Sequence, residues 1–222
     1  NKNIYGEYLP DEDGIIPITD DEYLKEDIVA YFIKFINTVF GKDNLEDNLE
    51  FISNALEVKG NTSREIIRNY FVNEFYKDHC NMYSVTGSGT RPIYWLFDSG
   101  KQNGFKALLY VHRYSKNIVG KIRSDYLQKV QEAEETALKN AEYIISTTGS
   151  AVDKARANKL KDKYVKQINE TRVYYQAISH VALQNIEINL DDGVKVNYAK
   201  FQCVEISNEG TKKQTINLLA KI

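Results

Sequence analysis

The stretch that decides the fold runs from Arg91 to Tyr114 and reads RPIYWLFDSGKQNGFKALLYVHRY. It contains two strand-like runs, Ile93–Asp98 and Phe105–His112, on either side of the turn-rich segment SGKQNG. Apolar and aromatic residues bounded by such a turn predict a β-hairpin. Both faces of each run are largely apolar, so we expect the hairpin to be covered on both sides, by helices or within a larger sheet.

Upstream of this stretch, apolar residues at helical spacing predict a small bundle of short-linked helices over residues 19–80. Thr19 with Glu22, and Thr62 with Glu65, have the spacing of a capping box. In a capping box the first side chain accepts a hydrogen bond from the backbone at the start of a helix. Each pair is therefore predicted to begin a helix.

Downstream, two long apolar stripes at helical spacing cover about residues 116–146 and 152–184, with TTGSA between them. Two helices of about 30 residues joined by a tight turn predict an antiparallel helical hairpin roughly 45 Å long. Alternating apolar residues on both sides of Asp191-Asp192-Gly193 then predict a second β-hairpin over residues 186–198.

These segments predict an α+β fold that is mostly α, with four parts. Residues 1–90 are expected to form an acidic helical bundle with an irregular N-terminal lead-in, and residues 91–114 the two-stranded β-hairpin. Residues 115–184 are expected to form the long-helix hairpin, a coiled-coil-like arm. Residues 185–222 are expected to form a β-hairpin and a tail that pack with the hairpin and the helical core.

The net charge of −2 conceals a strong asymmetry along the chain. Residues 1–60 carry 14 acidic and 5 basic side chains, a net charge of −9, whereas residues 91–131 carry 8 basic and 2 acidic ones, a net charge of +6. The acidic segment is interpreted as a solvated helical surface. The basic segment, which begins with the hairpin, indicates a polyanionic partner.

Several other functions find no support in the residues. No apolar run approaches the roughly 20 residues that span a bilayer, and no signal peptide is recognisable, so no membrane partner is expected. The chain begins with Asn1, which suggests an excised fragment, and Cys80 and Cys203 lie far apart, which favours a reducing cytoplasm over a disulfide framework. No metal site is predicted, and hydrogen-bonded structural roles are expected for the histidines, His79, His112 and His180.

Four segments of the chain resemble adenine-specific DNA methyltransferases of the BREX phage-defence type (PglX-like) and related single-chain restriction–modification enzymes. They occur in the order that the family shows. They are PDEDGIIPITDDEY (Pro10–Tyr23), NTSREIIRNYFVNEFYKDHC (Asn61–Cys80), the opening stretch Arg91–Tyr114, and LDDGVKVNYAKFQ (Leu190–Gln202). SVTGSGT before Arg91 departs from the family pattern, in which a shorter basic linker is expected.

The resemblance implies a parent enzyme that uses S-adenosylmethionine to methylate the exocyclic N6 of adenine in DNA. Such an enzyme holds the flipped base with an Asn-Pro-Pro-Tyr/Phe motif. That motif is absent here, because Pro10, Pro17 and Pro92 are isolated and follow Leu, Ile and Arg. A glycine-rich cofactor loop after a strand is also missing. The chain is therefore expected to be a C-terminal part of the parent, not itself catalytic and without a cofactor.

The leading hypothesis is a DNA-associated region that serves target recognition or acts as a spacer. Its expected partners are double-stranded DNA and the methyltransferase domain of the parent. Phosphate contacts are predicted for the basic side chains in and after the hairpin, Arg91, Lys101, Lys106, Arg113, Lys116, Lys121 and Arg123. Tyr94 or Trp95 could stack on a base, although strand spacing favours a core position for both.

The alternative hypothesis is a protein-interaction scaffold. In this interpretation the long-helix hairpin and the acidic helices dock the methyltransferase domain or other phage-defence proteins. The acidic first 60 residues favour it, because their charge repels DNA. A third interpretation, an independent nuclease, has no distinct cluster of metal-binding carboxylates to support it.

Overall fold

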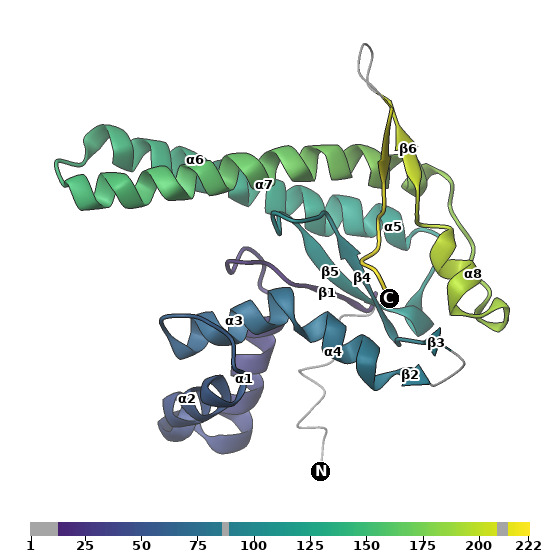
Figure 1. Cartoon of the computed structure of the whole chain (residues 1–222), viewed down its shortest axis with the longest axis horizontal. Coiled ribbons are helices and arrows are strands. Elements are labelled where there is room, and N and C mark those ends of the chain that lie inside the picture. The colour runs from purple at the N-terminus through teal and green to yellow at the C-terminus, as the bar shows by residue number, and fades with distance from the viewer. Residues whose placement is uncertain (1–12, 86–88, 208–212) are drawn as a thin grey trace. The chain divides into compact units, whose positions relative to one another are not determined.

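The computed structural model describes residues 13–85, 89–207 and 213–222. The chain divides into two compact units. The first unit contains the chain up to Leu96, Lys106–Tyr114 and the last two residues, and the second unit contains Phe97–Phe105 and Ser115–Ala220. Figure 1 shows the helices and strands of each. Helix predominates over small sheets, which confirms the predicted mostly-α fold class.

The helices of the first unit follow the apolar stripes of the sequence and pack around a common core. Val29, Leu49 and Ile67 are at most 1% exposed and form the centre of this core. Phe32 and Phe71 pack edge to face beside it, with ring centroids 5.5 Å apart. The predicted bundle is confirmed. Its helices are α1 (Ile28–Phe40), α2 (Leu45–Ala55), α3 (Ser63–Asn73) and α4 (Phe75–Met82).

Only one of the two predicted capping pairs begins a helix. Thr62 is the N-cap of α3, and its hydroxyl accepts the Glu65 N–H at 3.2 Å, as predicted. The prediction at Thr19 is wrong, because α1 begins only at Ile28. Asp27 caps α1 instead, with its carboxylate accepting backbone N–H groups of the first turn, those of Val29 and Ala30.

The predicted hairpin of the opening stretch is confirmed as β4 (Tyr94–Asp98) and β5 (Lys106–Tyr110). Residues on both faces of these strands are buried, as expected. The lead-in predicted to be irregular contributes a third strand, β1 (Ile15–Pro17), and the sheet has the order β1-β5-β4. Pro17 is tolerated there because β1 is a short strand at the sheet edge.

β1 runs antiparallel to β5 and carries the chain from the sheet to the helices. Ile15 lies opposite Leu109, and the N–H of Ile18, just after the strand, donates to the Lys106 carbonyl at 2.9 Å. The segment SVTGSGT before Arg91 contains a short pairing of β2 (Ser84–Val85) with β3 (Gly89–Thr90). Its central part, residues 86–88, lies outside the described residues.

The predicted helical hairpin is confirmed in the second unit. Its first arm contains α5 (Ile118–Lys121), a π-helical turn (Ile122–Leu127) and α6 (Gln128–Thr147), and its second arm is α7 (Ala151–Leu183). Ser150 caps α7 by accepting the Asp153 N–H at 3.3 Å. α6 and α7 lie side by side (Figure 1), and alanine, branched aliphatic and aromatic residues fill their buried faces, among them Val130, Ala141, Ala157, Tyr164 and Ile168.

The second β-hairpin predicted over residues 186–198 is wrong, because this segment forms a 3-10 turn (Leu190–Asp192) and α8 (Val194–Ala199). The Asn197 side chain favours this arrangement. Its amide nitrogen donates to the Gly193 carbonyl at 3.0 Å, and its oxygen accepts the Asn189 N–H at 3.1 Å. A hairpin does form further on, between β6 (Val204–Ile206) and β7 (Gln214–Ile216), and residues 208–212 lie outside the described residues.

Tyr174 of α7 is central to the core of the second unit. It is 1% exposed, its ring centroid lies 6.2 Å from that of Phe105, and its hydroxyl donates to the Leu218 carbonyl at 2.7 Å. Burial raises the pKa of Tyr174 well above its ordinary value, so the hydroxyl stays protonated and remains a donor. Phe97 and Phe201 pack edge to face in the same unit, with ring centroids 6.3 Å apart.

Candidate nucleic-acid interface

The seven basic residues predicted to contact DNA are divided between the two units. Arg91, Lys106 and Arg113 belong to the first unit. The second unit contains the other four, Lys101, Lys116, Lys121 and Arg123. The structure therefore places these residues relative to one another only within each of the two groups.

Lys106 differs from the other predicted contacts because it is buried. Its side chain is 8% exposed, and its ammonium group donates to the Val72 carbonyl at 2.7 Å. Val72 lies in the last turn of α3, where backbone carbonyls lack partners within the helix and a positive charge is favoured by the helix dipole. The structure thus gives Lys106 a packing role between sheet and helix, and we do not retain it as a phosphate contact.

The other two predicted DNA contacts in the first unit, Arg91 and Arg113, lie at its surface. Arg91 is exposed just after β3, and its backbone N–H donates to the Tyr83 carbonyl at 3.0 Å. Arg113 is exposed at the end of a 3-10 turn (Val111–Arg113). A Cβ added at Gly14 would lie 3.0 Å from the Arg113 Cδ, so the glycine permits a close approach of the arginine stem to the backbone.

In the second unit, Lys116 lies two residues before the first arm, Lys121 ends α5, and Arg123 lies in the π-helical turn. Lys116 and Lys121 are exposed. Arg123 is half-buried, and its guanidinium carbon lies 5.9 Å from the centroid of the Tyr175 ring. This distance fits a cation–π contact, which holds the Arg123 side chain against α7. Arg123 is therefore less free to reach a phosphate than the two lysines.

Lys101 lies on the turn that joins β4 to β5, and Glu170 of α7 fixes this turn in place. One Glu170 oxygen accepts the Ser99 hydroxyl at 2.8 Å and the Gly104 N–H at 3.1 Å. The other accepts the Gln102 N–H at 2.8 Å. Because the backbone of the turn is held at several points, Lys101 is presented to solvent from a pre-organised support.

Gln167, one helical turn before Glu170, completes the support of this turn. Its amide nitrogen donates to the Gln102 carbonyl at 3.0 Å. Gly104 is required where the turn meets α7, since an added Cβ would lie 2.6 Å from the Thr171 Cγ2 and 3.0 Å from the Gln167 carbonyl oxygen. The turn of the opening stretch is thus fitted to α7 by both hydrogen bonds and close packing.

The sequence prediction missed a second group of cations, on the first half of α7. The group consists of Arg156, Lys159, Lys163 and Lys166. Residues three and four apart share a helix face, so the spacing of these four was a readable signal. It was missed because net charge was summed over residues 132–184, where the acidic residues of α6 offset it.

Trp95 and His79 are structural, as their positions in the sequence predicted. Trp95 is 1% exposed, so its ring cannot stack on a base in this fold. His79 is 8% exposed and its Nε2 accepts the Tyr94 N–H at 3.3 Å. Burial lowers the pKa of His79, which keeps Nε2 available as an acceptor at neutral pH. Over residues 13–85, 89–207 and 213–222, no group of three or more metal-binding side chains gathers.

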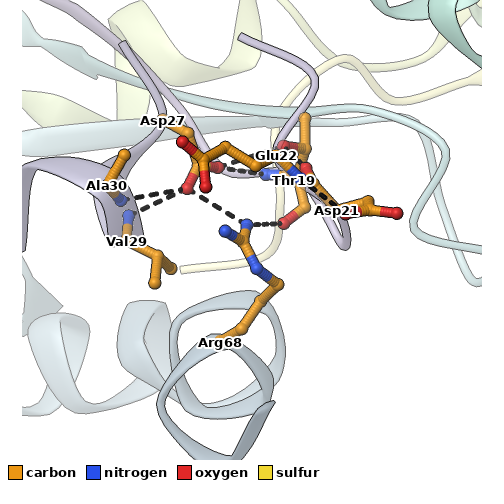
Figure 2. Close-up of polar contacts among 7 residues, drawn as sticks. All are labelled: Thr19, Asp21, Glu22, Asp27, Val29, Ala30 and Arg68. Atoms are coloured by element: carbon orange, nitrogen blue, oxygen red, sulfur yellow. Dashed lines mark hydrogen bonds and ion pairs between the residues drawn. The ribbon is translucent and has the colours of Figure 1, made fainter. Parts of the chain in front are cut away.

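The most densely bonded charged cluster in the first unit surrounds Asp27, which is fully buried (Figure 2). One of its carboxylate oxygens accepts from Arg68 of α3 at 3.0 Å and from the Val29 N–H at 3.0 Å. The other lies 3.0 Å from the Thr19 hydroxyl and 3.2 Å from the Thr19 N–H. The Arg68 guanidinium also donates to the Thr19 carbonyl at 2.8 Å.

This cluster ties together three separate pieces of chain: the segment after β1, the start of α1 and the middle of α3. Both carboxylate oxygens of Asp27 are occupied by donors, and Arg68 is only 15% exposed. A buried, fully bonded carboxylate has no free lone pair with which to act as a base or metal ligand. The cluster therefore holds the fold and is not a catalytic site.

Comparison with known proteins places this chain beside methyltransferases that act on adenine. It is 40% identical over 201 residues to the "Adenine-specific methyltransferase PglX" of Lacticaseibacillus casei (strain Zhang). It is 36% identical over 203 residues to the "Adenine-specific methyltransferase BrxX" of Escherichia coli O9:H4 (strain HS). No protein-family model matches the chain.

Each of these similarities covers 89% of this chain, so the resemblance read from four segments extends over nearly all of it. The resemblance to BREX-type adenine-specific methyltransferases, PglX and BrxX, is confirmed. The chain spans only 16% of the length of either relative. In the part of the chain that the structure describes, no helix combines the length and hydrophobicity that crossing a bilayer demands.

The first testable prediction concerns the buried pair. Replacing Arg68 with alanine should lower the free energy of unfolding by about 3–5 kcal/mol, because the Asp27 carboxylate would lose a charged partner without reaching water. The control is Arg64→Ala, which removes a pair with Glu46 whose side chains are 46% and 71% exposed. That loss should stay below about 1 kcal/mol. Urea unfolding of both variants measures the difference, and equal losses would contradict the structural role.

The second prediction concerns the turn that carries Lys101. Gly104→Ala should destabilise the chain by about 1–3 kcal/mol, because the new methyl group would overlap Thr171 and the backbone of Gln167. Gly149→Ala is the matched control, since an added Cβ there meets nothing within 4 Å. Thermal unfolding should separate the two variants. Indistinguishable melting temperatures would mean that the turn is not seated on α7 as described.

Proposed function

We propose that this chain is a DNA-associated, non-catalytic C-terminal part of an S-adenosylmethionine-dependent N6-adenine DNA methyltransferase of phage defence. The observation that supports it best is a set of exposed lysines in one unit, Lys101, Lys116 and Lys121. Among the described residues, none of the three has a carboxylate partner. Together with the similarity to adenine-specific methyltransferases, this favours a phosphate-binding surface.

The residues present do not fit a binding site for S-adenosylmethionine. The sequence has no Asn-Pro-Pro-Tyr/Phe motif. The sheet that β1 joins is antiparallel at that strand, and the short pairings β2–β3 and β6–β7 are antiparallel as well. A parallel strand–glycine-rich turn–helix unit is thus not formed by these strands. In this proposal, cofactor binding and methyl transfer belong to another part of the parent enzyme, and no step of the reaction is assigned to this chain.

The contribution proposed for this chain is to hold the duplex. An enzyme that modifies a base inside a duplex must extrude the nucleotide, which costs unstacking energy. Contacts to phosphates fix the register and orientation of a protein on DNA without reading its sequence. The pre-organised turn with Lys101 and the helix start with Lys116 and Lys121 would supply such contacts while the base is turned outward.

A second candidate function, a protein-docking scaffold, is supported by the charge of the first unit. Residues 1–60 carry a net charge of −9, and the surface of α2 includes the acidic residues Glu46, Asp47 and Glu50. Such a surface repels phosphate and suits a basic protein partner. The two functions can coexist in one chain. They separate in a deletion of residues 116–184 from the parent enzyme: lost assembly with intact DNA binding would favour the scaffold.

The third prediction tests DNA association by the 222-residue chain with a labelled duplex over a series of salt concentrations. Binding should weaken steeply with salt, and replacing Lys101, Lys116 and Lys121 with glutamine should reduce the log–log salt slope by about 1 for each phosphate that is no longer neutralised. The matched control replaces three exposed lysines of the acidic segment, Lys25, Lys42 and Lys59. The control changes net charge equally but should leave the slope unchanged.

Two outcomes would count against this proposal. Failure of the chain to bind any duplex at low salt would exclude DNA association by this part of the enzyme. Equal loss of affinity in both triple variants would show that overall charge, and not the surface around the turn and helix start, governs binding. Circular dichroism of each variant should retain the helical signal of the unchanged chain, so that unfolding is not mistaken for weaker DNA binding.

A further inference from the structure

The first half of α7 is the most basic helical segment of the second unit. Residues 151–166 contain six basic and two acidic side chains, a net charge of +4. In Figure 1 this half of α7 runs beside α6 at the end where the two helices are joined. The segment lies outside the basic stretch 91–131, so the DNA contacts predicted there do not account for its positive charge.

Four of the six basic residues lie on one face of the helix, at positions i, i+3, i+7 and i+10. They are Arg156, Lys159, Lys163 and Lys166, and we call them the α7 basic row. The interface with α6 uses a different face, the one with Ala157, Tyr164 and Ile168. The basic row is therefore turned away from α6. At 1.5 Å per residue, it is about 15 Å long.

Two cations of α7 pair with carboxylates of α6, whereas three members of the α7 basic row form no ion pair among the described residues. Lys161 pairs with Glu142 at 3.2 Å, and Arg172 pairs with Glu135 at 3.5 Å. Within the described part of the chain, Arg156, Lys159 and Lys166 are exposed and form no ion pair. Their charges thus lie close together along one helix face without an ion-pair partner, and an anionic partner would relieve their mutual repulsion.

The same face of α7 continues into the turn that presents Lys101. Glu170, which follows Lys166 by one helical turn on this face, is occupied by donors from residues 99–104. Its negative charge is therefore committed to the turn. Lys166, at the end of the α7 basic row, therefore lies one helical turn from the residue that holds the turn with Lys101, within the second unit.

We infer that the α7 basic row binds the phosphate backbone of duplex DNA as an extension of the surface around Lys101. This inference rests on the proposed DNA association. The α7 basic row is about 15 Å long, which matches the rise of roughly four base pairs at 3.4 Å each, so several successive phosphates can contact the row. Contacts to phosphates carry no sequence information directly, so this binding is expected to be independent of sequence.

The experiment compares two triple variants of the 222-residue chain on two labelled duplexes of equal length and unrelated sequence. The first variant replaces Arg156, Lys159 and Lys166 with glutamine. Lys163 is left unchanged because its ammonium lies 5.8 Å from the Tyr164 ring centroid. The second variant, with the same change in net charge, replaces exposed lysines of the same unit that lie off the row, Lys129, Lys139 and Lys195.

Loss of the α7 basic row should reduce the log–log salt slope by about 3 and weaken binding to both duplexes by the same factor. The control variant should bind as the unchanged chain does. Retained binding with an unchanged slope in the first variant would overturn the inference but leave the proposed function standing. No DNA binding by the unchanged chain would overturn both.

A rival occupant for the α7 basic row is the acidic segment of the same chain, residues 1–60. If that segment covered the row, replacing Arg156, Lys159 and Lys166 would leave DNA affinity unchanged or raise it. Either result overturns the inference. A drop in affinity restricted to one of the two duplexes would also overturn it, because phosphate contacts cannot discriminate between sequences.

Discussion

A carboxyl group that is wholly or partly removed from water must have its oxygen atoms hydrogen-bonded, and this requirement organises both units of the chain. In the first unit, Asp27 gathers donors from the segment after β1, from the start of α1 and from Arg68. In the second unit, Glu170 gathers donors from the turn between β4 and β5. Each acid joins segments that are distant in the sequence, and each is held by backbone N–H groups as well as side chains. Packing of apolar residues brings these segments together, while the carboxylates fix which parts of them meet.

The elements that could be predicted from the sequence are those with a long apolar pattern, or with strand and turn signals that occur together. The helical hairpin has apolar stripes many turns long, and the β4–β5 hairpin has two strands around a glycine-containing turn, so both were recognised. Prediction from local sequence failed where two residues could each cap the helix and a residue distant in the sequence determines which of them does. Thr19 and Asp27 can each cap a helix, and Arg68 favours Asp27 by pairing with it in the folded chain. At residues 186–198 the apolar alternation was too short to distinguish a strand from α8.

The basic residues of the predicted interface also differ in how well the sequence indicated their exposure. Charge density along the sequence pointed to the second unit's lysines, since exposed charges need no partner to be recognised. It misplaced Lys106, because the stem of a lysine can be buried when its ammonium reaches a free carbonyl, and the end of α3 provides one. It also overlooked the α7 basic row, because adding charges over a window does not sort them by helix face. Both errors arise because a charge count along the sequence does not show which groups are neighbours in the folded chain.

The division of β4 has a consequence for how the chain is made. Tyr94–Leu96 belong to the first unit, whereas Phe97 and Asp98 belong to the second, and Phe97 pairs with Leu219 close to the C-terminus. During synthesis, helices α1 to α4 emerge before strands β4 and β5. The first unit cannot complete its sheet until β5 has emerged, and Phe97 lacks its bridge partner Leu219 until a further 122 residues (219 minus 97) have been added. Over that interval the nascent chain carries an aromatic strand with one edge incompletely paired, and an unpaired strand edge is prone to aggregation.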